Sequence, residues 1–264
     1  MRERILGLME KKGTKRADAE KRVLFIQADL SSMDDVEMAF GKTIEAFGGL
    51  DVAVNNGNTP FHPQSLSYPP PAGVSDPESF AEGPNPRAFS PMLDINLRAV
   101  MLGTKLATSH FLSHNKPGVI VNTASMAAVV EVYRLAGYAA AKAGVLHLTR
   151  CLRPLGEKGI RVNAILPGAV MTPLVLTALR TPALKKFSYP DESEADVRKR
   201  SVPPELITEA MMMAIEDQTL CGDAVQILPR GIAVMSREIK RARPTPRTWE
   251  LDWERIGRVD TFKL

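Results

Sequence analysis

The stretch from Val119 to Lys142 constrains the fold of this chain more than any other. It begins with three β-branched apolar residues, Val119-Ile120-Val121, which predict a buried strand. It ends in a helix-forming segment where Tyr138 and Lys142 lie four residues apart, so both side chains project from one helix face. Ser125 follows the predicted strand, at the sheet edge where open α/β sheets bind ligands. A hydroxyl, a phenol and a cation that favours the phenolate suit proton transfer at an alcohol oxygen while hydride moves at carbon.

A Tyr-x-x-x-Lys pair alone is a weak signal, because many surface helices contain one. Here the pair is preceded, thirteen residues before the tyrosine, by a serine at a strand end, and other segments fit the same pattern. From about Val23 to Met235 the chain resembles the short-chain dehydrogenases/reductases. The segments that carry the resemblance, in order, are Asp29-Leu30, Leu50–Gly57 (LDVAVNNG), Ile95-Asn96-Leu97, Ser125, Tyr138 with Lys142, Gly159–Gly168 (GIRVNAILPG) and Thr172.

The resemblance implies an α/β fold with a Rossmann-like, mostly parallel sheet flanked by helices. Strands are expected near 23–27, 51–54, 118–122, 160–165 and 224–228, the last closing the sheet. The implied organisation is one domain over 1–235, with an atypical N-terminal helix in 1–22 and a substrate lid in 173–204. The Pro-, Ser- and Gly-rich stretch 58–91 predicts a surface loop, and 236–264 a basic tail.

The implied activity is an NAD- or NADP-dependent oxidoreductase that interconverts a secondary alcohol and a ketone. Tyr138 would be the acid/base, Lys142 would depress its pKa and bind the ribose, and Ser125 would hold the substrate oxygen. Asn96 would hold a water in the proton relay, although a mid-helix asparagine alone more often bends a helix or faces solvent. The relatives also imply homodimers or homotetramers formed through the helices around 91–115 and 138–155.

The cofactor would be held at its two ends. Asp29 would accept a hydrogen bond from the adenine amino group, and the Leu30 amide would contact the ring. At the other end, the backbone near Val170 and the hydroxyl of Thr172 would contact the nicotinamide carboxamide. Asn55 would border the cofactor, with ordinary turn chemistry as the alternative interpretation.

The beginning of the chain departs from the family. Such enzymes open with a strand, a Gly-rich turn and a helix whose N-terminus binds the cofactor diphosphate. Residues 1–22 are instead charged and helix-forming, and Gly7 and Gly13 follow no strand. With the first two strands of the sheet missing, the strand at 23–27 would lie three spacings, about 14 Å, from the strand at 51–54. The sequence favours a truncated chain or a misplaced start over a segment that fills the gap.

This departure keeps a second function class open, a non-catalytic or cofactor-free scaffold derived from the family, or an inactive truncated product. Titration with NADH and NADPH distinguishes it from an enzyme.

Composition narrows the partners. The net charge of +4 is mild and reflects solvated faces better than a nucleic-acid interface. Two cysteines fit a reducing compartment, and no apolar run reaches the roughly twenty residues of a membrane span. His110, His114 and His147 lack the spacing of a metal site. We therefore expect a cytoplasmic protein with a small alcohol or ketone as its partner and no metal, nucleic acid or membrane.

Overall fold

The computed structural model describes residues 2–57, 90–132, 135–180 and 191–235, and its centre is a five-stranded sheet. The strands are β1 (Val52–Asn55), β2 (Gly118–Thr123), β3 (Ile160–Pro167), β4 (Ala224–Leu228) and β5 (Gly231–Val234), in the order β1-β2-β3-β4-β5. The first four are parallel and β5 is antiparallel to β4. The predicted fold class is confirmed, and β5 is an additional strand that the sequence analysis missed.

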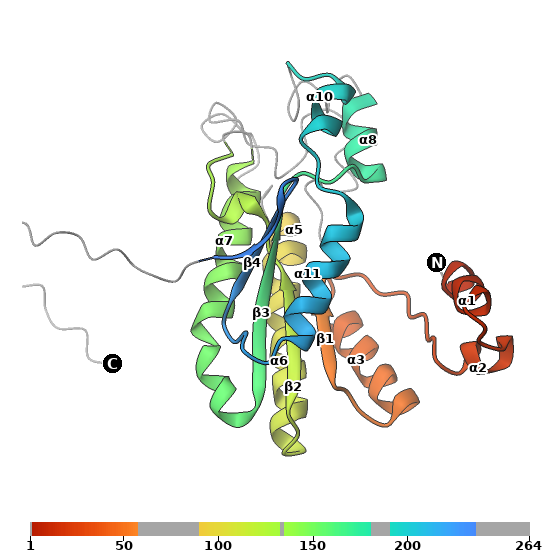
Figure 1. The fold of residues 1–264 in the computed structure, drawn as a ribbon. Helices are drawn as coiled ribbons and strands as arrows, with labels where there is room; N and C mark the ends of the chain where they lie inside the picture. The colour runs from red at the N-terminus through yellow and green to blue at the C-terminus, as the bar shows by residue number, and fades with distance from the viewer. Residues whose placement is uncertain (1, 58–89, 133–134, 181–190, 236–264) are drawn as a thin grey trace, which may run out of the picture.

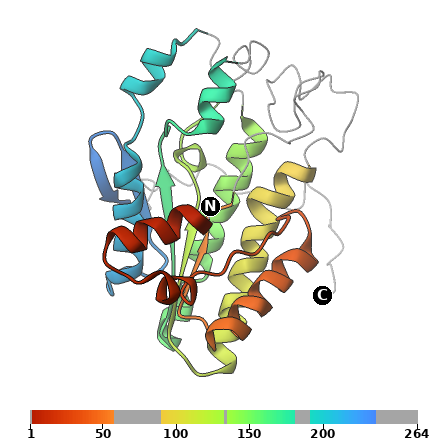
Figure 2. The ribbon, with the colours of Figure 1, turned by 90° about the vertical axis from the view of Figure 1, so that its right-hand side faces the viewer.

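Helices cover both faces of this sheet (Figures 1 and 2). The helices α6 (Ala99–Ser113) and α7 (Ala136–Cys151) pack on one face, with α3 (Met33–Phe47) beside α6, and α11 (Pro204–Glu216) packs on the other. All of β3 except Pro167 is buried, as expected for a parallel strand covered on both sides. Shorter elements complete the description: α5 (Ser90–Leu93), η2 (Asp94–Arg98), η3 (Met126–Ala128), η4 (Arg153–Lys158), α8 (Pro173–Arg180) and α10 (Glu194–Lys199).

The start and end of α3 follow from its sequence. The Ser32 hydroxyl accepts a hydrogen bond from the Asp35 amide at 3.2 Å, which satisfies one free donor of the first turn. Asp34 and Asp35 lie in that turn, where the helix dipole favours negative charge. Gly48 ends the helix with φ 74°, a left-handed conformation that glycine adopts without strain.

The N-terminal residues differ from the prediction. Residues 2–22 form two short helices, α1 (Arg2–Lys11) and α2 (Arg16–Glu20), which are joined by ion pairs from Arg16 to Glu3 and Glu10, while Arg16 also pairs with Glu20 within α2. The predicted strand at Val23–Gln27 is wrong, because this segment is extended but pairs with no described strand. A strand requires ladder hydrogen bonds, and this segment has no neighbour to form them with. Figure 1 shows it running from α2 to the body of the molecule.

Two predicted features fall outside the described residues: most of the surface loop (58–89) and the basic tail (236–264). Within the described part of the chain, no helix is long and apolar enough to cross a bilayer.

Candidate active site

Lys142 is a fully buried polar side chain of the candidate site. It lies on α7, it is fully buried, and its Nζ donates to the backbone carbonyl of Thr123 at 2.8 Å. This bond ties α7 to the C-terminal end of β2. Burial lowers the pKa of Lys142 from its ordinary value of 10.5 to about 8, because an ammonium group is poorly solvated in the interior.

Tyr138 lies one helical turn before Lys142, as predicted. The Lys142 Nζ is 5.6 Å from the centre of the Tyr138 ring, so the phenol and the cation are neighbours. Tyr138 itself is half-buried, which leaves part of its surface open to a ligand.

Ser125 completes the predicted set from the other side. It follows β2 by two residues and caps η3, where its Oγ accepts from the Ala127 amide at 3.1 Å. Because η3 packs against α7, the serine, the tyrosine and the lysine come from adjoining elements at the carboxyl edge of the sheet.

Asn96 lies in an unusual turn. The predicted helix from 91 to 115 is interrupted at η2, a π-helical turn, which the sequence did not reveal. Asn96 is fully buried there and its Nδ2 donates to the Met92 carbonyl at 2.9 Å. The turn packs on α7 so closely that a Cβ on Gly144 would lie 3.0 Å from Leu97. Single π-helical turns occur frequently at functional sites, because they redirect side chains without ending the helix.

A buried polar network lies beneath the site, and the sequence analysis did not predict it. The Asn122 Oδ1 accepts from Asn55 Nδ2 at 2.8 Å and from the Thr104 hydroxyl at 3.2 Å, while its Nδ2 donates to Thr149 Oγ1 at 3.1 Å. These bonds join β1, α6, β2 and α7. Asn122, as a polar residue within an apolar strand, was the only sequence signal.

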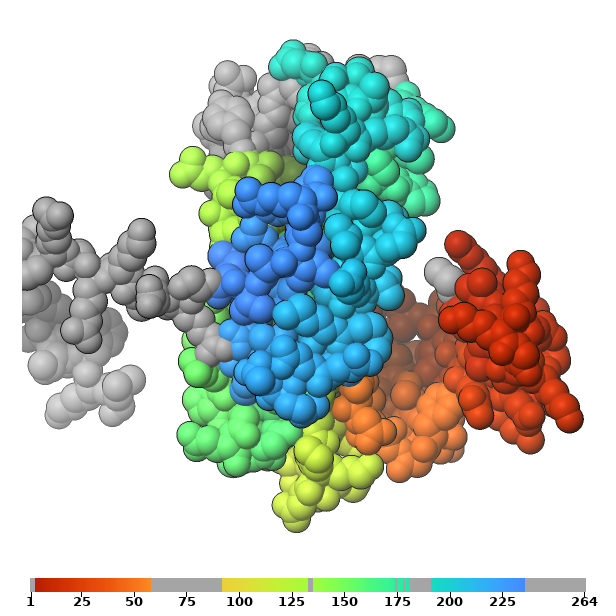
Figure 3. Space-filling view, in the orientation of Figure 1, coloured from red at the N-terminus to blue at the C-terminus, as the bar shows by residue number. Residues whose placement is uncertain are grey.

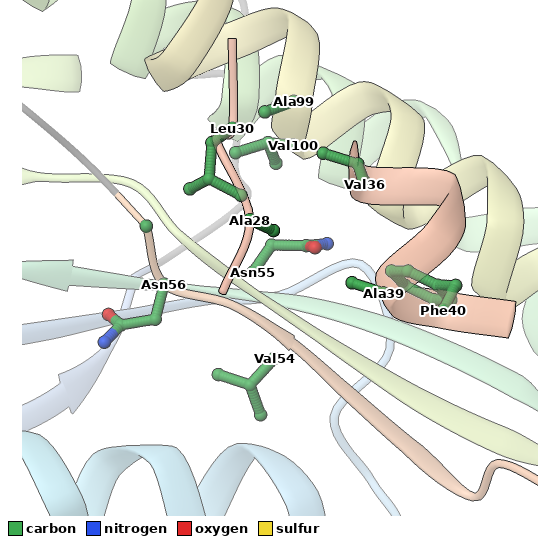
Figure 4. A pocket seen from close by; sticks show the side chains of 11 residues that line it. Ala28, Leu30, Val36, Ala39, Phe40, Val54, Asn55, Asn56, Ala99 and Val100 are labelled. Carbon is green, nitrogen blue, oxygen red and sulfur yellow. The ribbon is translucent and has the colours of Figure 1, made fainter. Parts of the chain in front are cut away.

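Asn55 belongs to this network rather than to an open turn. A Cβ on Gly103 would lie 2.3 Å from its Oδ1, so α6 approaches β1 closely at that point. The neighbouring Asn56 points to the other side of β1 (Figure 4) and accepts from the Thr123 hydroxyl at 2.9 Å.

The residues after β3 lie at the same sheet edge. The Thr172 amide donates to the Val170 carbonyl at 2.8 Å, and the Thr172 hydroxyl accepts from the Val175 amide in the first turn of α8. Thr172 therefore begins α8, and Val170 packs on the core cluster beneath α11.

Asp29 and Leu30 lie at the far end of the candidate site. The Asp29 carboxylate accepts from the amide and the hydroxyl of Ser31, at 2.8 and 2.7 Å. Leu30 borders an open, largely apolar groove of about 550 Å³ (Figure 4), and it contacts Gly57 so closely that a Cβ there would overlap it. The groove is lined by Ala28, Leu30, Val36, Ala39, Phe40, Val54, Asn55, Asn56, Gly57, Ala99 and Val100.

The described residues have the chemistry to bind a dinucleotide at its adenine end and at its nicotinamide end, but not between them. An apolar groove beside a carboxylate suits an adenine, and a buried ammonium beside a phenol suits a ribose hydroxyl and a reacting carbonyl. Within the described part of the chain, no Gly-rich turn leads from a strand into a helix between these ends. Among the described residues, a cofactor diphosphate would therefore lack the backbone donors that such ligands ordinarily use.

Three comparisons place the chain among known proteins. The family model of the short chain dehydrogenases matches residues 6–182. The 3beta-hydroxysteroid dehydrogenase 1 of Eggerthella lenta is 35% identical over 174 residues, which cover 66% of this chain and 58% of that protein. This chain thus spans less than two thirds of that relative.

Solved structures agree with the sequence match. A crystal structure of levodione reductase superposes with a TM-score of 0.63 at 28% identity, covering 76% of this chain and 74% of that one. A 3-ketoacyl-(acyl-carrier-protein) reductase from Brucella melitensis, complexed with NADH, gives 0.58 at 27% identity, covering 77% and 76%. With a family model matched over more than half of its length and the same parallel sheet, the chain belongs to the short-chain dehydrogenase/reductase family.

Proposed function

We propose that this chain carries the active site of an NAD(P)-dependent oxidoreductase that interconverts a secondary alcohol and a ketone. The observation that carries the proposal is the buried Lys142, held by Thr123 and placed 5.6 Å from the Tyr138 ring. Burying an ammonium group is unfavourable because it loses solvation, and buried ionisable groups with shifted pKa values cluster at functional sites. An ammonium group beside a phenol also favours the phenolate. The relatives' names, all dehydrogenases or reductases, point to the same reaction class.

A nicotinamide cofactor held by Lys142, Tyr138 and Thr172 would supply or accept the hydride at carbon. Tyr138 Oη gives a proton to the substrate oxygen during ketone reduction, and takes it back during alcohol oxidation. Ser125 Oγ donates to the same oxygen and orients it. Lys142 stays protonated, stabilises the phenolate and donates to a ribose hydroxyl. Asn96, buried in its π-helical turn, would hold a water in the relay behind Lys142 through which the proton is replaced.

The cofactor would be held at both ends of the site. Asp29 and Leu30 would bind the adenine beside the apolar groove, while Lys142, Tyr138 and Thr172 would bind the nicotinamide side with the backbone at Val170. Asn55 supports this arrangement from below, because its side chain fixes β1 against β2 and α6.

We also propose that 1–235 is one domain and that 173–204 forms its substrate lid. We also propose a homodimer or homotetramer formed through α6 and α7. Met101 and Leu112 on α6 are 48% and 39% exposed and would be available to such an interface. The four-helix interface of relatives would cover such residues.

The second candidate is a cofactor-free scaffold, and it is favoured by the lack of a Gly-rich turn between a strand and a helix among the described residues. Titration with NADH and NADPH separates the two functions. Losing two or three charge-assisted hydrogen bonds of about 1.5–3 kcal/mol each weakens affinity by roughly three orders of magnitude. We therefore expect the 264-residue chain to bind weakly, and a fusion carrying a strand, Gly-rich turn and helix of the kind that binds a diphosphate to bind far more tightly.

Binding by the fusion that is abolished by Lys142→Met supports the enzyme. A fusion that binds neither nucleotide supports the scaffold. Micromolar binding by the unmodified chain would show that another segment supplies the phosphate site.

A further inference from the structure

We infer that Thr123 is a positioning residue that fixes both Lys142 and the turn Asn56-Gly57 to the carboxyl end of β2, and so sets the separation between the two ends of the candidate site. The inference rests on the proposed function, because these are the ends at which a nicotinamide dinucleotide would bind. The contacts that carry it lie within the chain, so part of its test needs no ligand.

The backbone of Thr123 holds Lys142. Thr123 is the last residue of β2, and its backbone faces β1, because the Val119 amide, two ladder steps earlier, donates to the Asp51 carbonyl at 3.0 Å. If the parallel ladder continued, the Thr123 carbonyl would accept from the Gly57 amide. β1 ends before that residue, and the Lys142 Nζ donates to this carbonyl at 2.8 Å instead. The ammonium group therefore takes the place of the next ladder bond, at the point where β1 leaves the sheet.

The side chain of Thr123 holds Asn56. Its hydroxyl donates to the Asn56 Oδ1 at 2.9 Å, which keeps the departing chain beside β2. Side chains alternate along a strand, and Asn122 bonds to α6 and α7, so the Thr123 side chain faces the α11 side of the sheet. Asn56 points away from Asn55 (Figure 4), and α11 covers its own face of the molecule (Figure 3). Thr123 is thus bound by a lysine from one face of the sheet and by an asparagine on the other.

The turn passes this position on to the adenine end of the site. Leu30 lies so close to Gly57 that a Cβ on this glycine would overlap the leucine side chain. Asp29 is bound to the same segment, because its carboxylate accepts from the Ser31 amide at 2.8 Å. The direct contacts form one continuous path, which runs from Lys142 through Thr123, Asn56 and Gly57 to Leu30.

The separation of the two ends matters only to a ligand that spans both. Without the Thr123 hydroxyl, Asn56 and Gly57 would move together with Leu30, while Lys142 would keep its bond to the backbone carbonyl. Each half of the site would stay intact, and only the fit of a linked ligand to both halves at once would suffer. The loss should be roughly three- to tenfold in affinity, the ordinary worth of one net hydrogen bond.

The test compares Thr123→Val, which keeps the shape of the side chain and loses its hydroxyl, with Thr123→Ser, which keeps the hydroxyl. NADH, AMP and reduced nicotinamide mononucleotide are titrated by NMR, at millimolar concentration, against the 264-residue chain. Thr123→Val should weaken NADH roughly three- to tenfold and leave AMP and the mononucleotide within about twofold. Thr123→Ser should bind all three probes as the unmodified chain does.

The matched control is Thr149→Val. Thr149 is buried on α7 and its hydroxyl accepts from Asn122 at 3.1 Å, so this variant also loses a bond between a threonine and an asparagine, but outside the path. It should change the affinities for the three probes by a common factor. Asn56→Ala should reproduce the pattern of Thr123→Val, and the double variant should be no weaker than either, because both remove the same bond.

A readout without ligand is the NMR signal of the Leu30 methyl groups. Thr123→Val and Asn56→Ala should both shift it, whereas Thr123→Ser and Thr149→Val should not. If Thr123→Val does not fold, Asn56→Ala at the exposed turn replaces it in both measurements.

Two results would overturn the inference: Leu30 signals that neither Thr123→Val nor Asn56→Ala moves, or an NADH affinity that falls no more than those of the two halves. Failure of the unmodified chain to bind any of the three probes would count against the proposed function instead, and the Leu30 signals would then decide the positioning role by themselves.

Discussion

Replacing Lys142 by methionine should change how stability depends on pH. Burial lowers the pKa of Lys142 from 10.5 to about 8. Between these values the unfolded chain keeps a proton that the folded chain has released, so this lysine makes stability rise with pH across that window. Below pH 8 Lys142 is protonated in the folded state as well, and burying this ammonium group lowers the free energy of unfolding by about 3 kcal/mol.

The substitution has two opposing effects at pH 7. Methionine removes the buried charge, which recovers about 3 kcal/mol, and it leaves the Thr123 carbonyl without its donor, which costs about 1–3 kcal/mol. We therefore expect Lys142→Met to be at least as stable as the unmodified chain at pH 7, and less stable near pH 10.5, where the neutral amine still donates to Thr123.

The assay is urea unfolding of both chains at several pH values from 7 to 10.5, followed by circular dichroism. As the pH rises from 7 to 10.5, the free energy of unfolding of the unmodified chain should increase by about 3 kcal/mol relative to that of Lys142→Met. Lys105→Met, which removes an exposed lysine of α6, is the control and should give a difference that does not vary in this way. A constant difference for Lys142→Met across the whole range would refute the reasoning.

Other predictions concern the framework. Arg161 is buried and donates to four carbonyls at and beyond the end of α11, those of Ala214, Ile215, Asp217 and Leu220. Arg161→Met should lower the free energy of unfolding by about 3 kcal/mol, since buried carbonyls lose their donors, whereas Arg150→Met on the exposed side of α7 should change it little; equal effects would contradict this role. Gly103→Ala should cost about 1–3 kcal/mol through its clash with Asn55, and Asn55→Ala should relieve part of that cost in the double variant, so strictly additive effects would contradict the close approach.

The parallel core could be predicted from the sequence because its signals are local. The stretches at 118–122 and 160–165 are rich in β-branched residues, which favours strands, and Ser32 and Gly48 have the chemistry that starts and ends a helix such as α3. The site residues Ser125, Tyr138 and Lys142 follow from the same strand and helix, so their approach needed no long-range information.

The predictions that the structure contradicts, and the features that the sequence analysis missed, have physical causes. Val23–Gln27 has the composition of a strand, but strand formation depends on a neighbour that composition does not reveal. The strand β5 was missed although Pro229-Arg230 followed by Gly231 before Ile232 is a turn signal after β4. The π-helical turn at Asn96 and the network through Thr104 and Thr149 arise from packing between elements, for which isolated residues give no signal.

The most direct test of the proposed site is single-turnover ketone reduction by Tyr138→Phe, measured at millimolar NADH or NADPH and again in the fusion that restores a Gly-rich turn. The substitution removes only the phenolic oxygen, so folding and Lys142 should be preserved. We predict that the rate falls by about 10²- to 10⁴-fold, the ordinary contribution of a general acid, while cofactor affinity changes by less than about tenfold. Reduction by Tyr138→Phe at the rate of the unmodified chain would contradict the proton-transfer role of Tyr138 and with it the proposed active site.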